Sequence, residues 1–95
     1  MSNNYPKDFI VKVLNEFNKG DKSKAFNDLE NYLLKNSADL SARYNFAVMC
    51  KEVGRVDAAI LNYKMVIKSD KFNWQSRFNL YLIYLERELY GEALN

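Results

Sequence analysis

Two asparagines that could carry binding chemistry, Asn45 and Asn79, lie 34 residues apart in the chain. A side-chain amide donates and accepts hydrogen bonds at the same time, so two amides at a regular interval can hold the backbone of an extended peptide. Alternatively, both amides serve contacts between neighbouring helices. Either use is non-covalent.

Groups that could carry catalysis are few. The chain has one cysteine, Cys50, and no histidine, so it can build neither a zinc cluster nor an imidazole base. Cys50 lies on an apolar helical stripe without a visible group to activate it, which predicts a core residue. The carboxylates Glu86, Glu88 and Glu92 are expected on a solvated helical face. We therefore expect no enzymatic activity, no metal and no cofactor.

The composition of the chain also limits which classes of protein it can belong to. Fourteen Lys and Arg against twelve Asp and Glu leave a net charge of +2, too weak and scattered for a nucleic-acid footprint. No apolar run reaches the roughly 18 residues of a membrane span, and the first residues lack a secretory signal. The 95 residues, 48% of them hydrophobic, suit one small globular domain. We expect a cytoplasmic protein that binds neither nucleic acid nor membrane.

The elements that position these residues follow a period. Ala25, Ala59 and Ala93 are spaced by 34 residues, and Gly20 and Gly54 keep the same interval. A period of this length marks one supersecondary unit that must stack on its neighbours to bury its apolar face. Apolar residues recur at steps of three and four between turn signals, which predicts helix hairpins with the glycines in left-handed turns.

The central unit carries a family resemblance. It resembles the tetratricopeptide repeat through Tyr44-Asn45-Phe46-Ala47, Gly54, Asp57-Ala58-Ala59-Ile60, Tyr63 and Asp70. The resemblance implies an all-α fold, a right-handed αα-superhelix (solenoid) of about three helix hairpins with the last one incomplete. The expected divisions are an N-terminal tail (1–5) and a repeat domain (6–95) with units 6–39, 40–73 and 74–95.

The third unit departs from the family pattern. Between Trp74 and Tyr90 there is no glycine or proline, and Glu88 stands where the family has glycine. Either the chain still turns near Glu88, or the fifth helix runs straight on. In the second case an exposed apolar side would need another copy of the protein, as in domain exchange. That side comprises Leu80, Tyr84 and Leu89.

The resemblance also implies a function. Proteins of this family bind other proteins, so we expect a non-catalytic interaction module that receives a peptide or an amphipathic helix, or that forms a homodimer through its C-terminal hairpin. Trp74 is expected to pack between stacked hairpins. The expected concave groove is lined by Ser41, Tyr44, Asn45, Val48, Lys51, Gln75, Phe78, Asn79, Leu82 and Glu86.

Two other interpretations stay open. The chain could be the N-terminal recruiting or scaffolding segment of a larger enzyme, such as a glycosyl- or methyl-transferase, whose catalytic part lies beyond Asn95. An RNA-binding helical repeat is a more distant alternative, because such arrays need paired base-reading positions and a more positive surface.

Overall fold

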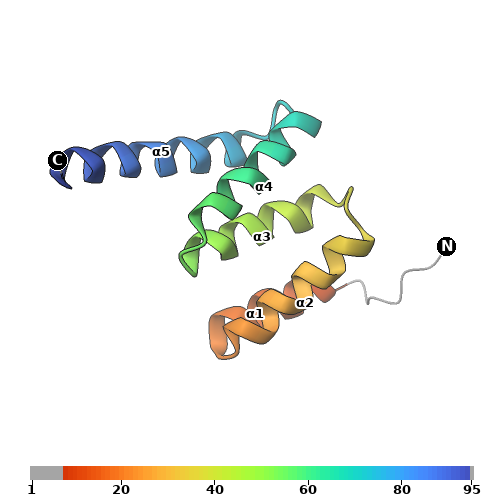
Figure 1. Ribbon diagram of the computed structural model, residues 1–95. Helices are drawn as coiled ribbons and strands as arrows, with labels where there is room; N and C mark the ends of the chain where they lie inside the picture. Colours follow the sequence, from red (N-terminus) through yellow and green to blue (C-terminus); the bar gives the residue numbers. More distant parts are fainter. Residues whose placement is uncertain (1–7, 95) are drawn as a thin grey trace. The chain divides into compact units, whose positions relative to one another are not determined.

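The computed structural model describes the backbone of residues 8–94 and the side chains of residues 8–89. In this part of the chain every element of regular secondary structure is an α-helix and there is no strand, which confirms the all-α class (Figure 1). The expected tail, residues 1–5, lies outside the described residues. The helices are α1 (Phe9–Lys19), α2 (Lys22–Lys35), α3 (Leu40–Glu52), α4 (Val56–Ser69) and α5 (Trp74–Leu94).

The chain divides into two compact parts between Ala42 and Arg43. In the first part, α1 and α2 pack against each other as a hairpin (Figure 1). The ring of Phe9 at the start of α1 stacks on Tyr32 near the end of α2, with centroids 5.1 Å apart. The apolar stripes of the two helices are buried at Val13, Phe17, Ala25, Phe26, Leu29, Tyr32 and Leu33.

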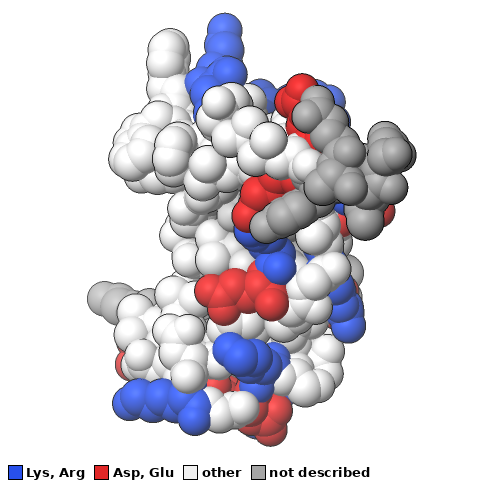
Figure 2. Space-filling model, turned by 90° about the vertical axis from the view of Figure 1, so that its left-hand side faces the viewer, with Lys and Arg blue, Asp and Glu red and all other residues white. Residues whose placement is uncertain are grey.

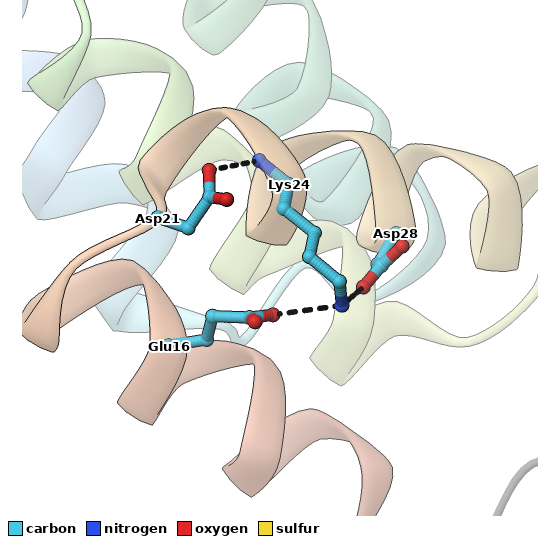
Figure 3. A network of polar contacts seen from close by, with 4 residues as sticks. All are labelled: Glu16, Asp21, Lys24 and Asp28. Carbon is cyan, nitrogen blue, oxygen red and sulfur yellow. Dashed lines mark hydrogen bonds and ion pairs between the residues drawn. The ribbon is translucent and has the colours of Figure 1, made fainter.

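Lys24 joins the two helices of this hairpin near their turn (Figure 3). Its backbone N–H donates to Asp21 Oδ1 at 2.9 Å, so Asp21 caps the start of α2. Its ammonium group lies 2.9 Å from Asp28 on α2 and 3.4 Å from Glu16 on α1. The hydrogen bond to Asp28, and then that to Glu16, raise the pKa of Lys24. The ammonium is exposed, so this network sets the local geometry more than the stability.

Asp39 connects the end of α2 to the first turn of α3. Its Oδ2 accepts a hydrogen bond of 2.6 Å from the Tyr32 hydroxyl, and its Oδ1 accepts one of 3.0 Å from the Ala42 N–H. The second bond satisfies one of the N–H groups that have no partner within a helix at its start. One carboxylate therefore both begins α3 and holds the buried tyrosine.

The two glycine turns differ. Gly54, between α3 and α4, has φ 86°, and the Arg55 N–H donates to Cys50 O at 2.8 Å, which closes α3 as expected for a glycine after a helix end. Gly20 has φ −177°, so the expectation of a left-handed turn there is wrong. The Gly20 N–H still completes a helical bond to Glu16 O, and the chain then leaves in an extended conformation directly into the cap of α2.

In the second part, α3 and α4 form a hairpin with a polar tie in its buried interior. Asn62 on α4 is buried, and its Oδ1 accepts a 2.8 Å hydrogen bond from Arg43 on α3. Its Nδ2 donates to Ala58 O at 2.8 Å, so both ends of the amide are used. Cys50 is fully buried, which confirms the core position expected for it.

The last helix continues without a turn near Glu88. α5 begins after Asn73, whose Oδ1 accepts from the Ser76 N–H at 2.9 Å, and it continues to Leu94. The second of the two alternatives is therefore the one that the structure has, because no glycine or proline interrupts the helix formers before Tyr90. Within residues 74–94 the third unit is a single helix and not a hairpin.

Candidate interaction surface

Two polar pairs connect α5 to α3. Asn79 Nδ2 donates to the Tyr44 hydroxyl at 2.9 Å, and Lys51 Nζ lies 2.9 Å from Glu86 Oε1. In both pairs the α5 residue follows its α3 partner by 35 positions, so the two helices run in the same direction, while α4 runs back (Figure 1). We call these four residues the α3–α5 seam.

The seam engages several of the residues expected to line a groove. Tyr44 is half-buried, and its ring meets Tyr63 of α4 edge-on, with centroids 5.8 Å apart. Because the Asn79 amide nitrogen is bonded to Tyr44, Asn79 positions α5 on α3. Asn45, on the next position of α3, is half-buried.

The remaining expected groove residues divide by exposure. Val48 on α3 and Leu82 on α5 are half-buried. Gln75 and Phe78 are exposed on α5, and Ser41 is exposed on the first turn of α3, in the other part of the chain.

A further surface lies on α5 and consists of large apolar side chains. Trp74, Phe78, Tyr81 and Leu89 are 67%, 52%, 59% and 57% exposed, and Leu85 between them is half-buried. Their spacing of three and four residues places all five on one face of the helix. We call this set the α5 stripe.

The opposite face of α5 is the packed one. It carries Ser76 and Ile83, which are buried, and α5 packs there against α4. The packed face is therefore covered by the chain's own helices, and the stripe is the side of α5 left in solvent. Trp74 belongs to this exposed side, so the expectation that it packs between hairpins is not met among the described residues.

The residues expected to mediate self-association fall on different sides of α5. Leu89 is part of the stripe, and Tyr84 is 44% exposed beside it. Leu80 is half-buried and lies one helical turn from both Ser76 and Ile83, on the packed side. Tyr81 and Leu85 were not among the residues expected to bind, although their spacing of three and seven residues from Phe78 is the signal that marks them.

Charged side chains are mixed over the surface. On the face shown in Figure 2, Lys and Arg side chains lie beside Asp and Glu side chains, and neither sign forms a continuous patch. Among the described residues, no group of three or more His, Cys, Asp and Glu could hold a metal ion. None of the described helices combines the length and the apolar character that crossing a bilayer requires.

Comparison with known proteins found no relative of this chain. No family model, no curated protein and no solved structure matches this chain.

Proposed function

We propose that this protein is a non-catalytic interaction module, and that the α5 stripe binds an amphipathic helix or peptide of a protein partner, a copy of the same chain included. The observation that carries the proposal is that three exposed aromatic rings, one exposed leucine and one half-buried leucine share one face of one helix. Contiguous apolar patches of this kind on soluble proteins mark interaction sites. Tetratricopeptide-like residues in the central unit support the same class of function.

The size of the stripe sets the expected affinity. Fully covered aromatic side chains bury about 150–250 Å² each, so three half-exposed rings and two leucines offer on the order of 400 Å². At about 25 cal/mol per Å², covering this area and an equal area on a partner gains about 20 kcal/mol. Lost freedom on association takes an estimated 4–15 kcal/mol of this gain. We therefore expect a binding free energy of about −8 kcal/mol, which corresponds to a dissociation constant in the micromolar range.

The expected groove borders the same surface. Phe78 belongs to both sets, and Gln75, Leu82 and Glu86 lie one turn from stripe residues along α5. The seam holds α5 against α3, so the stripe is presented on a supported helix, which lowers the ordering cost of binding. In this proposal Asn79 Oδ1 and Asn45 supply hydrogen bonds at the edge of an apolar contact, and the contact itself supplies most of the affinity.

Photo-crosslinking in cells that express the protein tests the proposal. We would place p-benzoylphenylalanine at Phe78 in the stripe and, as a matched control, at the exposed Asn27 on α2. Position 78 should crosslink to a discrete protein partner that position 27 does not capture. Equal crosslinking from both positions would show that the stripe is not a binding surface.

A second pair of variants separates the stripe from the amides. Tyr81→Glu should abolish crosslinking from position 78, because it places a charge at the centre of the apolar contact. Asn45→Ala together with Asn79→Ala should weaken it by less. If the double alanine variant instead removes crosslinking and the Tyr81 variant does not, the stripe is not the main binding surface.

A further inference from the structure

The α5 stripe has a direction along the helix. Its N-terminal half is aromatic, with Trp74, Phe78 and Tyr81. Its C-terminal half is aliphatic, with Leu85 and Leu89, and the half-buried Leu82 borders the stripe at the centre. A surface whose two halves differ in this way can complement itself when a second copy is reversed.

From this we infer that the partner of the stripe is a second copy of the chain, with the two α5 helices antiparallel and crossing between Tyr81 and Leu82; this inference rests on the function proposed above. In that register, Trp74 of one copy lies opposite Leu89 of the other, Phe78 opposite Leu85, and Tyr81 opposite Leu82. Each member of a pair is equally far from the crossing point along its helix. Every large ring therefore meets a leucine, whereas parallel helices would set ring against ring at one end and leave leucine on leucine at the other.

Charges at one edge of the stripe select the same orientation. Arg77 and Glu88 are both exposed and lie eleven residues apart, which is three helical turns along the same edge. In the antiparallel pair, Arg77 of each copy faces Glu88 of the other, offset by two residues or about 3 Å along the axis. Long side chains span such an offset. In a parallel two-fold pair, the edges that carry Arg77 and Glu88 lie on opposite sides of the contact, so these residues form no ion pair between the copies.

The local structure places Arg77 for this contact. Its Nε donates to Lys71 O at 2.8 Å, which ties the guanidinium to the loop before α5, and this bond does not use the two terminal nitrogens. Glu88 is in the region where the helix runs straight, so it keeps its position on the edge three turns away. A turn near Glu88 would have moved this carboxylate out of the register.

This dimer differs from domain exchange. The packed face of α5, with Ile83 and Ser76, is already covered within one chain, so each copy keeps its own helices and adds only the outer face. The contact is small and isologous, which agrees with weak, reversible pairing.

Sedimentation equilibrium of the full chain from about 5 to 300 μM tests the inference. We expect a monomer–dimer equilibrium with a dissociation constant in the micromolar range. Arg77→Glu alone and Glu88→Arg alone should each weaken the dimer about tenfold, because each converts two facing ion pairs into two repulsions. The double variant with both changes should restore the original affinity. The matched controls are Lys19→Glu on α1 and Glu30→Arg on α2, which change charge equally on exposed positions away from α5 and should leave the dimer unchanged.

The outcomes separate the two proposals. A monomeric mass up to 300 μM overturns the self-pairing, and crosslinking of position 78 to a different protein would then keep the interaction function. A dimer that the single charge variants do not weaken overturns the antiparallel register, since a parallel pair holds positions 77 and 88 of the two copies on opposite sides of the contact. Circular dichroism of each variant checks that its helices are intact.

Discussion

Gly54 and Gly20 close equivalent turns 34 residues apart, yet only Gly54 has a positive φ, of 86°. In this region a Cβ crowds the following carbonyl oxygen and costs roughly 1–2 kcal/mol in a residue other than glycine. At φ −177°, Gly20 is extended, and any residue adopts that conformation. A Cβ built on either glycine meets no heavy atom within 4 Å, so the backbone angle is the only term that separates the two positions.

Alanine at each position therefore isolates the backbone strain. Both substitutions stiffen the unfolded chain, which stabilises the folded state by about 0.4–1 kcal/mol. Gly20→Ala should keep this gain. In Gly54→Ala the backbone strain exceeds the gain, so this variant should be less stable than the original protein by about 1 kcal/mol. The difference between the two variants in the free energy of unfolding is then about 1–2 kcal/mol. At 4–8 °C per kcal/mol for a domain of this size, their melting temperatures should differ by about 10 °C.

Urea denaturation followed by far-UV circular dichroism measures this difference. Gly54→Asn serves as a control, because asparagine tolerates the left-handed region better than alanine and should fall between glycine and alanine. Equal effects of Gly20→Ala and Gly54→Ala would refute the reasoning, since the two turns would then share one conformation in solution.

Three further predictions follow from buried polar groups of the second part. Ser76 Oγ is buried without a hydrogen-bond partner among the described residues. Ser76→Ala should therefore raise the free energy of unfolding by about 1 kcal/mol, as measured by urea denaturation. A loss of stability would show that the hydroxyl has a partner. Asn62→Ala removes the group that accepts the hydrogen bond from Arg43, and it should lower the free energy of unfolding by about 1–3 kcal/mol. Asn31→Ala, at an exposed position of α2, is the control and should cost less. Equal costs of the two variants would show that the bond between Arg43 and Asn62 does not stabilise the fold. Burial raises the pKa of the Tyr63 hydroxyl. Above about pH 10 this hydroxyl loses its proton in the unfolded chain but keeps it in the folded chain, so the free energy of unfolding must fall as the pH rises. Tyr63→Phe should show a shallower fall between pH 9 and 11 by the same denaturation assay, and an unchanged slope would mean that the hydroxyl titrates normally.

Much of the fold could be read from spacing alone. Apolar residues at helical intervals predicted the hairpin of α1 and α2 and the hairpin of α3 and α4, and small residues predicted close contacts at Ala25 and Ala59, both of which are fully buried. The left-handed turn at Gly54 was predicted for the correct reason. These features depend on hydrogen bonds and side-chain contacts within a few residues, so a local pattern is enough to specify them.

Other features could not be read from the repeat period. Gly20 and Gly54 keep the same interval, but Asp21 directly after Gly20 caps α2 and Gly20 is extended, whereas Arg55 follows Gly54. Asn79 could be predicted as a polar helix position, but not its bond to Tyr44 across 35 residues. The straight course of α5 followed from its missing glycine and proline only as one of two alternatives.

The period of the residues determined that the chain is helical, where the turns of its first two units come, and that Ala25 and Ala59 are buried. The tertiary structure alone decided that α5 turns Ser76 and Ile83 inward and leaves Trp74, Phe78 and Tyr81 in solvent. The reason is physical: helical spacing states which side chains share a face, but whether that face is covered depends on the neighbour that packs against it.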